Sequence, residues 1–462
     1  MLGWGRTLRS SQMPPGPRGY PPVGVFRKVR QNPLQFFVEM ARRYGDVVSV
    51  PLGVRRLYLV SHPDHIQRVL QDSDGVYQKG PAAARVRSLF DGSLTMIDGE
   101  PWRRRRQLMR PAFQPPRLLP MVPMITELTG IMLDRWQHRT ALNQPLDLLR
   151  EMTDLTRAII LRVVFGYVAP SEAHAVGQAL GGAVEHVNQQ LWSALGWLGR
   201  FPTPAAHRGR RALRTLDELI SRRIEQGHRQ GHPDGDLLTM LREARDEETG
   251  QGLTEAQLHS EVKALLVAGH TTTSSGLAWV WYLLSQHPAV EQRLGCEVQA
   301  ILEERPPAAE DLSGLEHTRK LIEETLRLYP PTWVTARRSL ASVDIGGFHI
   351  PANATVLVSP YVMHRDPRFW EEPERFDPDR FSLGRSVGRP RGVYFPFGAG
   401  PRACIGSAFA LVEMQLIVAM VAQRYRLTLI PGRQIEGDPV ITLRPRHGLL
   451  MTLHRRPRIS SA

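Results

Sequence analysis

Residues 397–406 read Phe-Gly-Ala-Gly-Pro-Arg-Ala-Cys-Ile-Gly, and this stretch decides how the chain is interpreted. It sets Cys404 between glycines and an arginine, directly before an apolar run from Ile405 to Val421 that predicts a helix. A thiolate at the start of a helix is stabilised by free backbone N–H groups and by the positive end of the helix dipole. The sequence therefore predicts a thiolate that can bind iron axially.

The residues next to Cys404 support this interpretation. The glycines allow the backbone to fold tightly around the sulfur, the arginine adds a cation, and the phenylalanine can shield one side from water. These residues are Phe397, Gly398, Gly400, Arg402 and Gly406. The alternative is a small buried apolar side chain, an interpretation that we keep for Cys296.

The loop resembles the haem-ligand loop of the cytochrome P450 family. The resemblance implies a mainly α-helical fold with small β-sheets, in which haem b lies between a long central helix and the helix that follows the cysteine. It also implies that Cys404 ligates the iron. Residues 398–403 match a dinucleotide fingerprint as well, but no strand precedes them and no acidic residue follows about 20 positions later. NAD(P)H or flavin must therefore be bound by a separate electron donor.

Length and composition indicate one large domain. The chain has 462 residues, of which 42% are hydrophobic, and it contains no linker, repeat or low-complexity tract. We expect a flexible tail with a proline-rich hinge at 1–20 and a single domain at 21–462. Two cysteines exclude a disulfide framework and suit a reducing cytoplasm. Small and polar residues interrupt the apolar run at 264–284, so we expect no transmembrane anchor.

The formal net charge of +14 does not by itself indicate a nucleic-acid-binding protein. Only four of the 59 basic residues are lysines and the other 55 are arginines, which points to a codon bias. No nucleic-acid-binding motif accompanies the charge. A basic patch for an acidic electron donor is the functional alternative.

A long central helix is predicted from Thr254 to Gln286. Thr254 and Gln257 carry a capping-box signature, and Pro288 ends the helix. At 1.5 Å per residue its length is roughly 50 Å, enough to cross the whole domain.

Small and hydroxyl-bearing residues occupy the middle of this helix, namely Ala268, Gly269, Thr271, Thr272 and Thr273. Gly269 would let a flat ligand lie against the helix, and the Thr272 hydroxyl can bond the Ala268 carbonyl. Close helix packing is the alternative explanation for the small residues. The resemblance implies that Thr272 helps to deliver protons to bound O2. Thr271, however, stands where the family has an acidic residue, so Thr271, Thr273 or ordered water must replace the carboxylate.

Further cofactor contacts are implied by the resemblance. Trp102 and Arg106 are four residues apart and share a helix face, at positions that contact a haem propionate in the family. Arg337 and Arg402 match two further propionate contacts. The neighbouring arginines form either a solvated surface or a docking patch for the electron donor, and they are Arg103, Arg104, Arg105 and Arg110.

Glu324 and Arg327 are three residues apart and precede Pro373-Glu374-Arg375-Phe376. These residues resemble the buried Glu-Arg-Arg triad of the family, which predicts that Glu324, Arg327 and Arg375 form it. Because a buried triad is expensive to leave half-paired, we expect loss of Glu324 to prevent haem retention.

The substrate pocket follows from family position and is predicted to be lined by Leu89, Leu94, Leu265, Ala268, Trp333, Val334, Val440 and Ile441. Its apolar character favours a hydrophobic substrate, although the same residues could be ordinary core. Residues 191–201 are expected to form an apolar lid or, as the weaker alternative, a membrane contact.

The activity implied is that of a monooxygenase that inserts one oxygen atom of O2 into a lipid-, terpene- or polyketide-like molecule by hydroxylation or epoxidation. We expect a cytoplasmic monomer that receives electrons from a ferredoxin with its reductase or from a flavoprotein. The missing acid suggests a peroxide-driven hydroxylase or a rearrangement enzyme as the alternative. A non-catalytic haem-thiolate sensor is a further alternative.

Overall fold

The computed structural model describes residues 13–19, 24–53, 55–80, 86–141, 144–191, 204–230 and 236–456. The chain divides into two compact units, each assembled from three segments. Unit 1 comprises Met1–Ala84, Trp333–Arg375 and Gly388–Ala403, and unit 2 comprises Arg85–Thr332, Phe376–Val387 and Cys404–Ala462. Because each unit combines distant segments, no linker marks the boundary between the units in the sequence.

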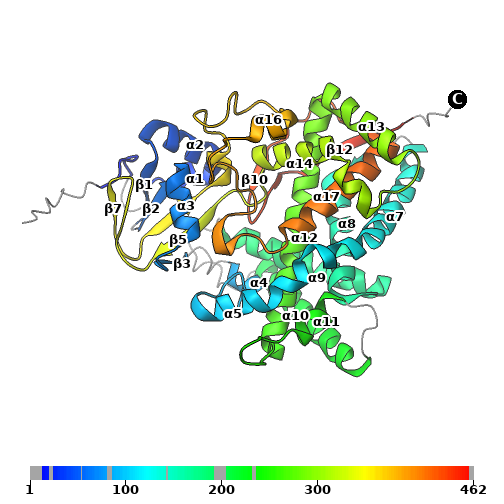
Figure 1. Cartoon of the computed structure of the whole chain (residues 1–462), viewed down its shortest axis with the longest axis horizontal. Helices are drawn as coiled ribbons and strands as arrows, with labels where there is room; N and C mark the ends of the chain where they lie inside the picture. The colour runs from blue at the N-terminus through cyan, green and yellow to red at the C-terminus, as the bar shows by residue number, and fades with distance from the viewer. Residues whose placement is uncertain are drawn as a thin grey trace, which may run out of the picture. The chain divides into compact units, whose positions relative to one another are not determined.

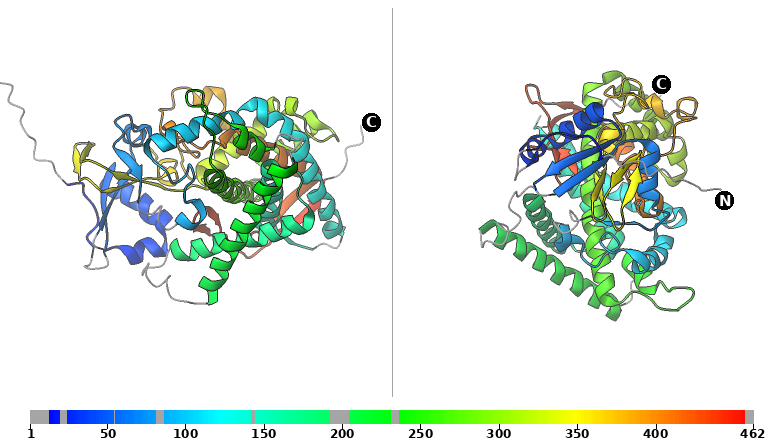
Figure 2. Two further views of the ribbon diagram at one scale, coloured as in Figure 1. Left: turned by 90° about the horizontal axis from the view of Figure 1, so that it is seen from below. Right: turned by 90° about the vertical axis from the view of Figure 1, so that its left-hand side faces the viewer.

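Unit 1 is organised around a five-stranded sheet with the strand order β1-β2-β8-β5-β3. Its strands are β1 (Val47–Leu52), β2 (Arg55–Val60), β3 (Tyr77–Lys79), β5 (Thr335–Ser339) and β8 (Thr355–Val358). β2 and β8 are parallel and the other neighbours are antiparallel. Figure 2 shows the blue strands of the N-terminal segment beside yellow strands from late in the chain.

The remaining elements of unit 1 are short. They are α1 (Phe26–Gln31), α2 (Pro33–Tyr44), α3 (Pro63–Gln71), the hairpin of β6 (Val343–Ile345) with β7 (Phe348–Ile350), α15 (Pro360–Met363) and the 3₁₀ turn η7 (Gly400–Arg402). The segment 13–19 lies on β1, since Ser49 N–H donates to the Pro15 carbonyl at 2.8 Å. A Cβ on Gly16 would come within 1.9 Å of the Ser49 oxygen. The flexible tail expected at 1–20 is therefore wrong for these residues.

Unit 2 is mostly helical (Figure 1). Its helices before the central one are α4 (Arg87–Phe90), α5 (Gly99–Met109), α6 (Pro115–Leu118), α7 (Val122–Ala141), α8 (Leu148–Phe165), α9 (Pro170–Leu191), α10 (Pro204–Gln230) and α11 (Leu237–Glu243), with the 3₁₀ turns η2 (Arg110–Phe113) and η3 (Leu119–Met121). The central helix is α12 (Glu255–Gln286). After it come α13 (Pro288–Leu302), η5 (Ala309–Ser313), α14 (Glu316–Leu328), η6 (Pro378–Phe381), α16 (Leu383–Ser386) and α17 (Ser407–Arg424).

Two small sheets complete unit 2. One has the order β4-β12-β9, built from β4 (Leu146–Asp147), β9 (Tyr425–Leu429) and β12 (Leu450–Arg455). The other pairs β10 (Gly437–Pro439) with β11 (Leu443–Pro445). The predicted fold class, mainly α with small sheets, is confirmed.

The predicted boundaries of the central helix are confirmed. The Thr254 side chain accepts from the Gln257 N–H and the Gln257 side chain accepts from the Thr254 N–H, which completes the capping box. α12 is buried along most of its length because α8, α14 and β11 pack around it. Such all-round burial identifies a core helix.

Gly269 provides the close approach between α12 and α8. A Cβ at this position would lie 2.7 Å from Cδ1 of Ile160, so the Ile160 side chain occupies the space that the glycine leaves. The expectation that Gly269 leaves room for a flat ligand is wrong, and the alternative of close helix packing is correct at this residue.

Among the described residues, α17 is one helix that is long and apolar enough to cross a membrane, and 61% of its apolar window is buried in the protein. α8 and α9 pass the same test as a pair, but they are bent by 112°. Core helices of soluble proteins also pass this test, so the finding is weak evidence for a membrane span.

We predict that Gly269→Ala destabilises the protein by about 1–3 kcal/mol, because the added methyl group overpacks the α8–α12 contact. The measurement is the free energy of unfolding in urea. Gly130→Ala is the matched control, since nothing lies within 4 Å of a Cβ on that helical glycine of α7. Equal unfolding energies for the two variants would contradict the assignment of Gly269 to helix packing.

Candidate active site

One face of α12 remains accessible in the middle of this buried helix. Ala268 is exposed and Leu265 and Thr272 are half-buried, whereas Leu266 and Val267 are fully buried. Leu265, Ala268 and Thr272 recur at the spacing of one helix face. An accessible stripe on a core helix indicates a surface that faces a ligand rather than a neighbouring helix.

The three threonine hydroxyls of this region bond to their own helix. The Thr272 hydroxyl donates to the Ala268 carbonyl at 2.8 Å, as predicted. Thr271 and Thr273 donate in the same way to Val267 and Gly269, at 2.9 and 3.1 Å. Each hydroxyl proton therefore points to a carbonyl of the helix, and each hydroxyl oxygen can still accept a hydrogen bond from a further partner.

Glu413 is a buried acid that the sequence analysis missed. It lies on α17 with 1% of its surface exposed, and neither carboxyl oxygen has a well-aligned hydrogen-bond partner in the described part of the chain. Burial raises the pKa of Glu413 well above its usual value, while the Thr273 hydroxyl beside it acts in the opposite direction. Burial therefore favours the protonated, uncharged form of this carboxyl group. A single acid within the apolar run 405–421 was the sequence signal.

Cys404 begins the last segment of unit 2 and its side chain is accessible. Desolvation by the protein around it raises the pKa of the thiol, while the Gly406 N–H and Arg106 lower it. The expectation that the loop alone favours the thiolate is thus not met, because desolvation is the largest contribution. A bound cation would deprotonate the sulfur, since metal ligation requires the thiolate.

Trp102 and Arg106 lie on α5, as predicted, with Trp102 buried and Arg106 half-buried. Arg106 lies within electrostatic reach of Cys404. The neighbouring arginines differ in their contacts and exposure. Arg104 bonds to Thr249 and Gln251, and Arg105 points inward to Glu261, so that the exposed members of the predicted patch are Arg103 and Arg110.

The loop before Cys404 belongs to unit 1, where its glycines adopt left-handed backbone conformations. Gly398 and Gly400 have φ of 73° and 70°. A Cβ on Gly400 would lie 2.3 Å from the Leu70 carbonyl oxygen, so this turn requires glycine. Gly406 has an ordinary φ of −93° and stands at the N-cap of α17.

The two further arginines expected at the propionates lie near each other within unit 1. Both Arg337 and Arg402 lower the pKa of Asp72, which burial raises. Arg337 is buried on β5, where it donates to the Thr335 hydroxyl. Arg337 and Arg402 therefore both lie within electrostatic reach of Asp72.

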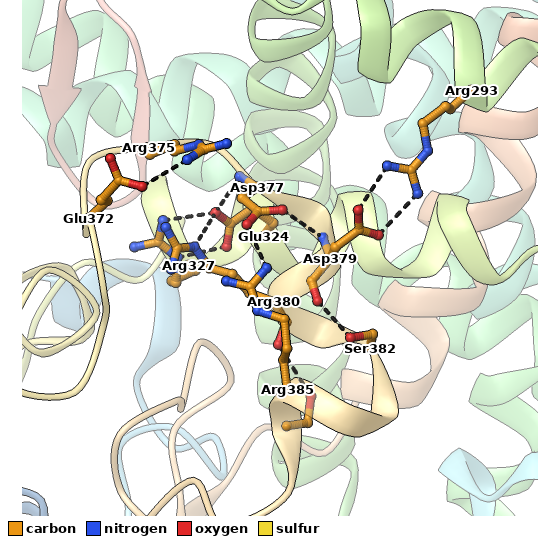
Figure 3. Close-up of polar contacts among 11 residues, drawn as sticks. Arg293, Glu324, Arg327, Glu372, Arg375, Asp377, Asp379, Arg380, Ser382 and Arg385 are labelled. Carbon is orange, nitrogen blue, oxygen red and sulfur yellow. Dashed lines mark hydrogen bonds and ion pairs between the residues drawn. The ribbon is translucent and has the colours of Figure 1, made fainter.

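The predicted ion triad exists with a different third member. Arg327 donates to Glu324 through two bonds of 2.7 and 2.8 Å, and both side chains are fully buried (Figure 3). Arg380 of η6 forms the other ion pair, with 3.4 Å between its Nε and Oε1 of Glu324. Arg375 lies at the surface and donates to Glu372 at 2.8 Å.

The choice of Arg375 as the third member was therefore wrong. Pro378-Asp379-Arg380-Phe381 repeats the pattern of residues 373–376 five positions later, and the second copy folds as η6 against α14. The Asp377 N–H also donates to Glu324, at 2.9 Å, which fixes this second copy beside the acid.

The predicted pocket residues divide by exposure. Leu89 is fully buried, and Trp333 is buried in unit 1, where its ring contacts Phe37. Neither residue keeps appreciable accessible surface, and their assignment to the pocket stays a prediction. Leu94 is also nearly buried. The predicted pocket residues that keep accessible surface are Leu265, Ala268, Val334, Val440 and Ile441. The expected lid falls largely on 192–203, outside the described residues.

The sequence profile described as "Cytochrome P450" matches residues 14–450 of this chain. The chain belongs to the cytochrome P450 family. Among its relatives, cyclooctatin synthase of Streptomyces melanosporofaciens is 34% identical, with 92% of each chain covered. Cyclooctat-9-en-7-ol 5-monooxygenase of the same organism is 36% identical over 90% of each chain. Pentalenene oxygenase of Streptomyces avermitilis is 30% identical over 96% of this chain and 97% of its own.

Solved structures agree with the fold of this cytochrome P450. The haem domain of cytochrome P450DA superposes with a TM-score of 0.89, at 26% identity, covering 97% of this chain and 99% of that one. Retinoic acid-bound cyanobacterial CYP120A1 gives a TM-score of 0.85 at 26% identity, with 97% and 100% covered. The protein is a P450 monooxygenase, and the family implies a haem cofactor.

The residues of this chain fit a haem. Cys404 provides an accessible sulfur, the Gly406 N–H bonds to that sulfur, and Arg106 supplies a nearby cation. Ala268 adds an accessible, small side chain on α12. A soft anionic ligand with a hydrogen-bond donor and a neighbouring cation is the donor set that a haem iron with propionates requires.

We predict that Arg380→Ala destabilises the protein by about 3–5 kcal/mol and lowers its haem content, because it leaves the buried Glu324 with one cation fewer. Glu324→Gln should also impair haem retention. Urea unfolding and the haem-to-protein ratio are the measurements.

Arg375→Ala is the matched control for Arg380→Ala. The exposed pair with Glu372 predicts a change within about 1 kcal/mol and a normal haem ratio. If Arg375→Ala proved the more damaging substitution, the assignment of Arg380 to the triad would be wrong.

Proposed function

We propose that this cytochrome P450 hydroxylates a cyclic terpenoid, inserting one oxygen atom of O2. The accessible stripe of Leu265, Ala268 and Thr272 on an otherwise buried helix carries the proposal, because it joins an apolar surface to a hydroxyl group. Three relatives support the substrate class through the terpenoids in their names, cyclooctatin, cyclooctat-9-en-7-ol and pentalenene.

The other apolar residues of the predicted pocket are suited to a hydrocarbon. Val440 and Ile441 follow β10 with half-buried side chains, and the Ile441 backbone N–H is held by Asn188. In unit 1, Val334 is half-buried. We propose that these residues, with Leu94, bind the substrate mainly through burial of apolar surface.

The cofactor is proposed to be haem b, which supplies the iron that activates dioxygen. In this proposal the Cys404 sulfur ligates the iron, and Trp102, Arg106, Arg337 and Arg402 bind the propionates through charge-assisted hydrogen bonds. Further contacts come from the ring and backbone of the loop residues Phe397, Gly398 and Gly406.

Proton delivery is proposed to use the threonines of α12 and the acid of α17. Thr271 carries no carboxyl group, whereas burial favours the protonated form of the Glu413 carboxyl, which lies beside the Thr273 hydroxyl. When the Thr273 hydroxyl turns from the Gly269 carbonyl to an ordered water, it can give its proton to that water and take up the Glu413 proton in exchange, and the water in turn can pass a proton to the Thr272 hydroxyl. Glu413 thereby supplies the carboxyl group that Thr271 lacks.

The electron donor is proposed to be a separate protein, a ferredoxin with its reductase or a flavoprotein. The exposed Arg103 and Arg110 offer cations to such an acidic partner. We propose a monomeric enzyme in the cytoplasm. A peroxide-driven hydroxylase or a rearrangement enzyme is the second candidate, favoured by Thr271 alone.

The test is a spectral titration of the haem-loaded enzyme with pentalenene and cyclooctat-9-en-7-ol, followed by product analysis with a ferredoxin system and, separately, with hydrogen peroxide. Displacement of the iron's water ligand and a hydroxylated product that requires the ferredoxin system are expected. No spectral change with any cyclic terpenoid would overturn the substrate class, and product formation with peroxide alone would favour the second candidate.

We predict that Thr272→Ala uncouples the reaction, so that several-fold more NAD(P)H is consumed per product and hydrogen peroxide is released, because the hydroxyl that relays protons is lost. Thr272→Ser keeps the hydroxyl and should retain most of the coupling. Unchanged coupling in the alanine variant would remove Thr272 from the proton route.

We predict that Glu413→Gln slows turnover about tenfold and raises the kinetic solvent isotope effect, because an amide cannot exchange a proton as a carboxyl group does. Haem content and unfolding midpoint should stay close to the parent, since glutamine has nearly the same size and burial already favours the uncharged form of the native carboxyl. An unaltered isotope effect would show that Glu413 is only structural.

A further inference from the structure

A second buried acid, Glu261, lies on the same face of α12 as the proposed pocket. Glu261 precedes Ala268 by seven residues, two turns of the helix or roughly 10 Å. It is 1% exposed and ionisable, and no step of the proposed reaction uses it. A buried carboxyl group at this place requires an explanation.

Two hydrogen bonds connect Glu261 to other parts of unit 2. The backbone N–H of Leu94 donates to its Oε1 at 2.7 Å, and Nη1 of Arg105 on α5 donates to the same oxygen at 3.1 Å. Nη1 of Arg105 also donates to the Gly92 carbonyl. Glu261 and Arg105 therefore hold both ends of the three-residue segment 92–94.

The backbone of this segment also lies directly on α12. Gly92 has a φ of 73°, and a Cβ there would come within 2.9 Å of the Ser260 hydroxyl oxygen. The Ser93 hydroxyl donates to the Phe90 carbonyl at 2.6 Å, and the Ser93 carbonyl accepts from the Met96 N–H. The segment is thus shaped by its own turn, while its attachment to α12 depends on the Glu261–Arg105 pair.

We propose that Glu261 and Arg105 are positioning residues that hold segment 92–97 against α12 and so determine how closely the substrate is enclosed beside Leu94. The inference rests on the proposed function, because it takes the Leu94 side of α12 as a pocket wall. Neither residue contacts the reacting atoms. Their loss should change the affinity for the substrate and the position of hydroxylation more than the rate of electron transfer.

The primary experiment is hydrogen exchange at the amides of 92–97 in the haem-loaded enzyme, which needs no substrate. Glu261→Ala should speed exchange at Leu94 about tenfold or more, because the acceptor of its N–H is removed. Arg105→Ala is the second variant and should speed exchange in the same segment. Matched controls are Glu255→Ala, an exposed acid on α12, and Arg117→Ala, an exposed arginine on α6.

Glu261→Gln distinguishes the loss of the hydrogen-bond acceptor at position 261 from a general destabilisation of the protein. Burial raises the pKa of Glu261 to about 7, while Arg105 and the Leu94 N–H lower it, so that the native carboxyl is more protonated at pH 6 than an exposed glutamate is. Glutamine keeps an oxygen acceptor and should restore protection of 92–97 at pH 6. Exchange at Leu94 that is unchanged in both alanine variants would overturn the proposal.

The functional readout is the dissociation constant and product distribution with cyclooctat-9-en-7-ol, and the dissociation constant of the iron ligand 4-phenylimidazole. We expect both constants to rise about tenfold in Glu261→Ala, an altered ratio of hydroxylated products, and recovery in Glu261→Gln. If no terpenoid binds the parent enzyme, the proposed function fails, whereas the exchange data and 4-phenylimidazole still test the positioning role. Faster exchange with unchanged affinity for every probe would overturn the link to the pocket.

Discussion

The buried charge of Glu324 is the constraint on which much of unit 2 depends. A carboxylate with no exposed surface is strongly unfavourable unless cations and hydrogen-bond donors surround it. Arg327 comes from the same helix, whereas Arg380 and the Asp377 N–H come from a segment about 50 residues later. The acid is fully paired only when α14 and η6 have both formed and met, which links the local helix to the long-range fold.

The same physical requirement explains the other buried acids. The Glu261 carboxyl group accepts hydrogen bonds from Arg105 and from the Leu94 N–H. These bonds offset the cost of burying the carboxyl group, and they attach a loop to the core. Glu413 has no cation and no aligned donor in the described part of the chain, so burial raises its pKa and favours the protonated form. Of these three acids, Glu413 lacks both a cation and an aligned hydrogen-bond donor, and it is therefore the acid suited to hold and release a proton.

The central helix packs tightly against α8 and also leaves part of its surface accessible. Gly269 brings α12 close to α8, while Ala268, one residue earlier, stays accessible. Adjacent residues point about 100° apart on a helix, so one can serve packing and the next can face a ligand. The run of small residues is therefore neither purely structural nor purely functional, and both interpretations of it apply to different residues.

The sequence by itself determined the cysteine loop, the boundaries of α12, the bond from Thr272 to Ala268 and the family. These depend on local rules, namely glycine conformations, capping and the spacing of residues along one helix. Only the tertiary structure decided that Arg380 rather than Arg375 pairs with Glu324, since the two copies of the Pro-acid-Arg-Phe pattern are locally alike. Likewise only packing buried Leu89 and Trp333 and placed Glu413 beside Thr273, because burial and pKa depend on contacts between segments that are distant in the chain.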